Sequence, residues 1–228
     1  MSGEFGCGPV VPARRKGPVM AETIWKEYSE AYAFLGNSLL KPMSQTPAVG
    51  LEPEFWDAFP RFGSDEVEAA VSACAKHARS VQAEAENGVD VVKECSVEFT
   101  HLFVGPPTPA AAPWETMHRG ENATVGFGES TFEMKRLLRS VGLEIHNENN
   151  QYEDHMGIEL LLLAVLCERI GQDVSAEDVA AYIESHPFAW IGRLQEQVAE
   201  ACPDGYFAGL IEVGRCVMKA QLEDLAGR

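Results

Sequence analysis

The chain has 228 residues, and its 18 Lys and Arg against 35 Asp and Glu give a formal net charge of −17. This charge excludes a general nucleic-acid-binding protein, because such proteins carry basic surfaces that contact phosphates. With 46% apolar residues, the chain is long enough to bury one substantial core, and we predict one folded domain over residues 21–228.

Residues 1–20 are rich in Gly and Pro and carry a net charge of +2, so we expect a disordered tail. The basic run Arg14-Arg15-Lys16 is not followed by an apolar segment, and no export signal is predicted. The longest apolar stretch, Leu160 to Cys167, is shorter than the roughly 20 residues that span a bilayer. The six cysteines contain no C-x-x-C pair, so we expect reduced thiols and a cytoplasmic protein.

Helical periodicity of apolar residues accounts for most of the chain, and no strand pattern competes with it. Apolar spacing, capping residues and helix breakers predict helices over residues 22–40, 64–87, 89–104, 129–141, 154–170, 175–185, 187–201 and 203–225. The segment 154–170 is apolar nearly all round, which is typical of a helix in the middle of a bundle. The predicted fold class is therefore all-α, a single-domain helical bundle.

A connection of 26 residues, Gly105 to Ser130, interrupts the helices and contains four glycines and four prolines. Connections of this length without a pattern of their own are usually functional or disordered. Trp114 argues against disorder, because an indole in such a loop either folds back on the core or forms the wall of a binding groove.

Two groups of polar residues could bind a metal. The run Glu153-Asp154-His155 is followed one helical turn later by Glu159, although capping and the helix dipole alone explain acidic residues at a helix start. Glu115-x-x-His118 has the spacing of half a di-iron site, but the chain has no second copy. An all-α metal-dependent enzyme using Glu115, His118, His155 and Glu159 is therefore one alternative, and a purely structural role is another.

Motifs for a catalytic serine, a phosphate-binding loop or a dinucleotide-binding fold are all absent from the sequence. Four segments nevertheless resemble, in order and spacing, the signature segments of the TorD/DmsD family. They lie between Glu98 and Leu194 and are Glu98 to Pro106, Pro113-Trp114-Glu115-Thr116, Asp154 to Leu160, and His186-Pro187-Phe188-Ala189-Trp190.

The resemblance implies an all-helical cytoplasmic chaperone rather than an enzyme, with no cofactor of its own. Its implied partner is the precursor of a molybdoenzyme of the DMSO or TMAO reductase type. The chaperone would bind the twin-arginine signal peptide and hold back export until the client's cofactor is inserted, in transient contact with the membrane translocase. Nucleotide binding is suggested for the family, but no phosphate-binding loop is visible here.

A peptide with two arginines followed by an apolar stretch needs carboxylates beside a hydrophobic groove. The sequence offers Glu115, Glu153 and Asp154 as carboxylates, and His155 as a hydrogen-bonding partner of Asp154 or of the peptide. The side chains expected to line the apolar part of the groove are Leu102, Phe103, Trp114 and Trp190. The acidic body would also attract a basic peptide over a distance, an effect that salt screens.

Overall fold

A computed structural model describes residues 18–119, 127–145 and 151–227. Residues 1–17 of the tail predicted over residues 1–20 therefore lie outside the described residues, and residues 18–20 form the start of the first helix. The described part of the chain is all-α and has no strand, as predicted. Its α-helices are α1 (Pro18–Leu40), α2 (Pro53–Ala58), α3 (Asp65–Glu86), α4 (Val91–Phe103), α5 (Glu129–Ser140), α6 (Met156–Glu168), α7 (Ala176–Ser185), α8 (Pro187–Ala201) and α9 (Tyr206–Ala226).

Several helix starts follow from residues that the sequence analysis identified. Ser64 caps α3 by accepting a hydrogen bond from the Val67 N–H, and Ser175 caps α7 with reciprocal bonds to Asp178. Pro187 begins α8, where its missing N–H costs nothing. The short helix α2 has no counterpart in the predicted elements, because six residues are too few to display a helical period.

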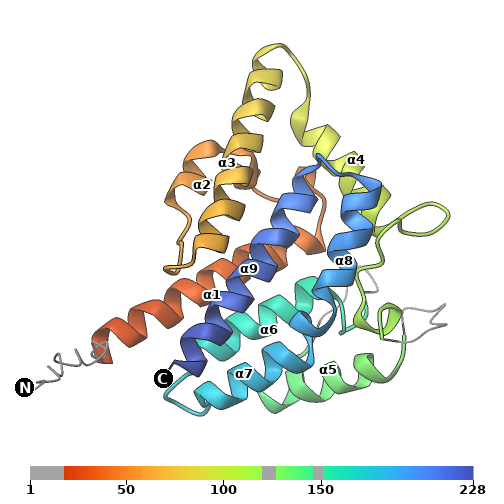
Figure 1. The fold of residues 1–228 in the computed structure, drawn as a ribbon. Helices are drawn as coiled ribbons and strands as arrows, with labels where there is room; N and C mark the ends of the chain where they lie inside the picture. The colour runs from red at the N-terminus through yellow and green to blue at the C-terminus, as the bar shows by residue number, and fades with distance from the viewer. Residues whose placement is uncertain (1–17, 120–126, 146–150, 228) are drawn as a thin grey trace, which may run out of the picture.

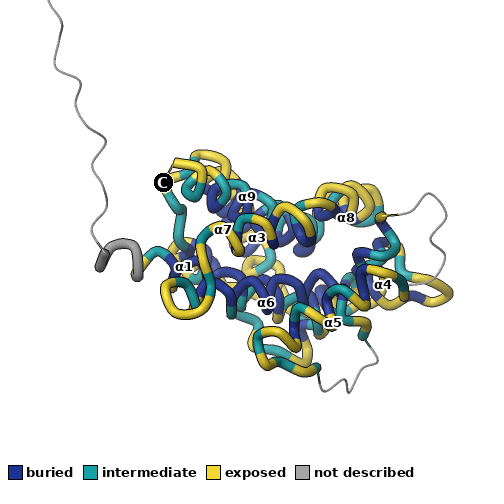
Figure 2. The backbone as a smooth tube through the Cα atoms, turned by 90° about the horizontal axis from the view of Figure 1, so that it is seen from below, coloured by how far each residue is buried: buried dark blue, intermediate teal, exposed yellow. Residues whose placement is uncertain are grey.

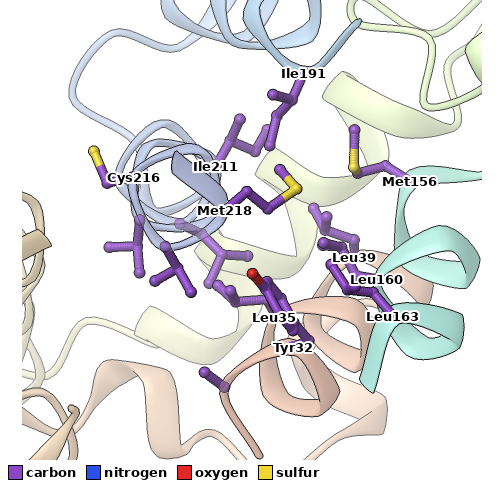
Figure 3. Close-up of a cluster of buried hydrophobic side chains, with 14 of the residues drawn as sticks. Tyr32, Leu35, Leu39, Met156, Leu160, Leu163, Ile191, Ile211, Cys216 and Met218 are labelled. Carbon is purple, nitrogen blue, oxygen red and sulfur yellow. The ribbon is translucent and has the colours of Figure 1, made fainter. Parts of the chain in front are cut away.

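The helix α6 is the centre of the bundle. Figure 2 shows it buried along its length, between α1 and the C-terminal helices. Side chains of α1, α6, α8 and α9 meet in one cluster, in which Leu35, Leu160, Ile191 and Met218 face one another (Figure 3). Within the described part of the chain, no helix combines the length and hydrophobicity needed to cross a bilayer.

The remaining helices cover this centre from two sides. In Figure 1, α2 and α3 stand at one end of the molecule, while α5 and α7 lie at the other. The last helix, α9, packs against α3, α8 and α1. Its first turn is capped from a distance, since the Glu98 carboxylate accepts hydrogen bonds from the N–H groups of Tyr206 (3.1 Å) and Phe207 (3.0 Å).

The helices α1 and α6 approach each other closely at a pair of glycines. A Cβ atom on Gly36 would lie 2.7 Å from the carbonyl oxygen of Gly157, and one on Gly157 would lie 2.8 Å from that of Gly36. Such distances are too short for any side chain, so the two backbones must separate if either glycine is replaced. This contact places α6, and with it the residues just before α6, relative to the rest of the bundle.

We therefore expect Gly157→Ala to lower the free energy of unfolding by about 1 to 3 kcal/mol, the usual cost of overpacking. The matched control is Gly192→Ala in α8, where an added Cβ atom meets nothing within 4 Å. This control should be neutral or stabilising by up to about 1 kcal/mol, because alanine is the better helix former. Chemical denaturation of both variants measures the difference, and equal stability would contradict the close packing of α1 on α6.

Candidate functional site

Three of the four signature segments meet at the start of α6. The loop that carries Trp114 runs antiparallel to the residues before the helix, with a β-bridge between Trp114 and His155. The Glu115 N–H donates to the carbonyl oxygen of Asp154 (2.9 Å), and the Met156 N–H donates to that of Pro113 (2.8 Å). The long connection is thus folded back on the core at this point, as one of the two readings of Trp114 predicted.

Asp154 holds this arrangement together. Its buried carboxylate accepts hydrogen bonds from the backbone N–H (2.9 Å) and the hydroxyl (2.6 Å) of Thr116, and from the hydroxyl of Thr131 (3.0 Å). Burial raises the pKa of Asp154, although these hydrogen bonds act in the opposite direction. One side chain therefore joins the loop, the start of α5 and the start of α6.

His155 is the N-cap of α6. Its Nδ1 atom accepts a hydrogen bond from the Gly157 N–H (3.0 Å), which requires a neutral ring with the proton on Nε2. Burial lowers the pKa of His155 to about 3, so the ring stays neutral at physiological pH. The sequence analysis assigned capping to the acidic residues of this run, but the cap of α6 is His155, and Asp154 bonds across to the loop.

Two buried carboxyl groups, those of Glu115 and Glu159, lie next to each other behind the loop. Glu115 accepts contacts from two neighbouring side chains: its Oε1 atom is ion-paired with Arg119, and its Oε2 atom lies 3.1 Å from Nδ1 of His186. Burial, and then the charge of Glu115, raise the pKa of Glu159 well above its ordinary value. Glu159 is thus held protonated beside Glu115, and Trp190 Nε1 donates a hydrogen bond to its Oε2 atom (3.0 Å).

Aromatic residues surround this pair of carboxyl groups. The ring of His118 stacks on Trp190 at 4.9 Å, and its Nε2 donates to the carbonyl oxygen of Ala112 (2.7 Å). The Tyr182 hydroxyl donates to the carbonyl oxygen of Glu159 (3.0 Å). Since Trp190 and His186 come from the fourth signature segment, and Glu115 and Glu159 from the second and third, these segments share one polar network.

Three of the four side chains expected to line an apolar groove lie in the interior of the protein. Leu102, Phe103 and Trp190 are all buried in the core, where large apolar side chains contribute most to stability. Trp114 is only half-buried and packs against Tyr152, with ring centroids 6.1 Å apart. Of the predicted carboxylates, Glu115 and Asp154 are fully buried, whereas the Glu153 side chain is 20% exposed and lies 3.3 Å from Lys135.

The residues of the metal-dependent alternative do not form a ligand set. Each ring of His118 and His155 already uses a nitrogen to bond the protein backbone, and only Glu115 and Glu159 lie together. Within residues 18–119, 127–145 and 151–227, no group of three or more His, Cys, Asp or Glu side chains could hold a metal ion.

An exposed aromatic cluster lies beside these segments, and three of its four members were missed by the sequence analysis. It consists of Trp114, Phe127, Phe132 and Tyr152, whose neighbouring rings lie 5.0 to 6.1 Å apart. Phe127 and Phe132 are 47% and 51% exposed, and Tyr152 is 38% exposed. Contiguous exposed aromatic surface of this kind usually marks a binding site. The outward position of Phe132 on the amphipathic helix α5 was the signal available in the sequence.

The protonated state of Glu159 leads to a pH-dependent prediction. Glu159 ionises near its ordinary pKa of 4.5 once the chain unfolds, but only at much higher pH in the folded protein. Its contribution to stability is therefore fully present below pH 4.5 and is lost as the pH rises toward the folded-state pKa. Glu159→Gln mimics the protonated form and does not titrate. The melting temperature of this variant minus that of wild type should therefore increase from pH 5 to pH 8, because only wild type loses this contribution. Glu196→Gln, at an exposed position on α8, is the control and should show a constant difference; a constant difference for Glu159→Gln would contradict the assignment.

Comparison with known proteins identifies relatives of this chain. It is 28% identical over 120 residues to the Tat proofreading chaperone DmsD of Salmonella typhi, covering 53% of this chain and 56% of that protein. It is 25% identical over 145 residues to the chaperone protein TorD of Aliivibrio fischeri, covering 60% and 67%. A third relative, the chaperone protein TorD of Shewanella amazonensis, is 24% identical over 203 residues, covering 78% and 80%.

The chain spans little more than half the length of the DmsD proteins that it matches. The relatives are named as chaperones and not as enzymes. Residues 64–196, which contain all four signature segments, match the nitrate reductase delta subunit family. The resemblance noted from those segments is thereby confirmed, and the chain belongs to the nitrate reductase delta subunit family, the family of the TorD/DmsD-type chaperones.

Proposed function

We propose that this protein is a cytoplasmic chaperone that binds the twin-arginine signal peptide of a molybdoenzyme precursor and delays export until the cofactor is inserted. The observation that carries the proposal is the convergence of the signature segments on one unit, next to an exposed aromatic cluster. A buried core alone does not require such a surface, whereas a peptide receptor does. The names of the relatives, which are chaperones of this type, support the same function.

The apolar stretch of the signal peptide would bind the aromatic cluster of Trp114, Phe127, Phe132 and Tyr152. Aromatic side chains provide large contact areas with few rotatable bonds, which is why they dominate the energetics of many interfaces. The indole N–H of Trp114 has no acceptor among the described residues, although the atom is shielded from solvent.

The arginines of the peptide would pair with carboxylates that flank the cluster. Glu153, with 20% of its side chain exposed, is the most accessible of the three predicted carboxylates and pairs with the half-exposed Lys135. Asp154 and His155 have a positioning role in this proposal, because their polar atoms bond to the loop and to the first turn of α6. Leu102, Phe103 and Trp190 would support the site from the core.

The charge of the molecule favours the encounter with such a peptide. Residues 18–119, 127–145 and 151–227 carry most of the acidic groups of a chain whose net charge is −17. A basic peptide is attracted by this field before contact, and added salt weakens the attraction. The association rate should therefore fall with ionic strength more steeply than the dissociation rate rises.

The first test compares two peptides on the wild-type protein. A synthetic twin-arginine signal peptide should bind at least tenfold more tightly than the same peptide with two lysines, because only guanidinium groups pair with a carboxylate in a bidentate manner. Isothermal titration calorimetry at two salt concentrations measures both affinities. Equal affinity for the two peptides, or no binding of either, would contradict arginine recognition.

The second test places the apolar stretch on the aromatic cluster. Phe132→Ala should weaken binding of the twin-arginine peptide about tenfold or more, as expected for a hot-spot aromatic residue. Val97→Ala, which shortens another exposed apolar side chain (60% exposed, on α4), is the matched control and should leave the affinity unchanged. Both positions face solvent, so neither variant should alter folding. If the two variants bind the peptide equally well, the cluster is not the docking surface.

A further inference from the structure

Stability of the core alone does not require the pairing of Arg119 with Glu115, because an apolar contact of similar size usually stabilises a core at least as well. Glu115 is fully buried, whereas the Arg119 side chain is 42% exposed. Burying the carboxylate costs free energy because it loses its hydration. A pair with a half-exposed guanidinium offsets little of that cost. In the free protein this position thus holds one guanidinium group next to a buried carboxylate.

The surroundings of Glu115 strengthen this interpretation. Beside it, Glu159 keeps a fully buried Oε1 atom that accepts no hydrogen bond from any described residue. The other contacts of Arg119 are to the protein backbone, since its guanidinium also donates to the carbonyl oxygen of Ser185. Two carboxyl groups and the carbonyl oxygen of Ser185 thus surround this position, and all three are acceptors for the N–H donors of an arginine.

The site is also close to the molecular surface. Ser185 and His186 line a groove of about 390 Å³ between α5, α6 and α7. His186 is bonded to Glu115 through its Nδ1 atom, so one ring connects this buried carboxylate to the lining of the groove. The floor of the groove is apolar, with Leu137, Leu162 and Leu166, and its rim includes Asp173 and Asp178.

We propose that Arg119 occupies, in the free protein, the site for one arginine of the client peptide, and that the client guanidinium displaces it from Glu115 on binding. This inference rests on the proposed signal-peptide function and specifies how an arginine is selected. The exchange replaces one guanidinium with another, so the buried carboxylate is never left without a cation. A lysine ammonium group cannot reproduce the planar set of donors and would displace Arg119 poorly.

The test uses Arg119→Met, which keeps the aliphatic part of the side chain and removes the competing guanidinium. This variant should bind the twin-arginine peptide about two- to fivefold more tightly than wild type, the factor expected for releasing a half-exposed ion pair. The matched control is Arg193→Met, because Arg193 also contacts this loop, through the carbonyl oxygen of His118, but pairs with no carboxylate there. The control should not bind more tightly than wild type.

A second variant, Glu115→Gln, should lose most of the preference for the twin-arginine peptide over its twin-lysine version. A thermal melt shows whether Glu115→Gln is folded. If this variant is unfolded, the comparison of Arg119→Met with Arg193→Met tests the exchange alone. If Arg119→Met binds the twin-arginine peptide no more tightly than Arg193→Met does, the exchange is overturned. The proposed function would still stand if the wild-type protein prefers the twin-arginine peptide over the twin-lysine peptide. Failure of the wild-type protein to bind the twin-arginine peptide would instead contradict the proposed function itself.

Discussion

The burial of two neighbouring carboxyl groups is the constraint on which the rest of the site depends. An ionised carboxylate without partners is too costly to bury, and two of them side by side cannot both stay charged. Glu159 therefore keeps its proton, while the carboxylate of Glu115 contacts the side chains of Arg119 and His186. To satisfy these groups, the loop, α6 and the start of α8 must come together, and this fixes the surface that they present.

The same constraint explains why polar residues recur in segments that otherwise belong to the core. Asp154, His155 and Glu159 stand within the most apolar part of the chain, and every one of them bonds to backbone or side chains of another segment or to the first turn of α6. Networks of this kind specify one arrangement of the backbone, since a displaced loop would leave several buried groups without partners. The aromatic cluster lies outside the network, and the backbone next to Trp114 and Tyr152 is fixed by the network.

Periodicity and capping residues in the sequence were sufficient to predict the helices around the core, including the buried α6 and the start of α7 at Ser175. The sequence could not reveal that Glu115 would be buried, because burial depends on contacts with α6 and α8 that are distant along the chain. The capping of α9 by Glu98 escaped prediction for the same reason. Phe127 and Phe132 were missed because an apolar residue in a loop or on a helix normally indicates packing and not a surface.

Amide hydrogen exchange with and without a twin-arginine signal peptide tests the central claim most directly, namely that the segments around Trp114 and Asp154 form one receptor surface. We predict slower exchange on binding in residues 113–119 and 152–159, with no change in α3, which lies at the other end of the molecule (Figure 1). Protection confined to α3 and α9, or no protection anywhere while the peptide is bound, would contradict the claim.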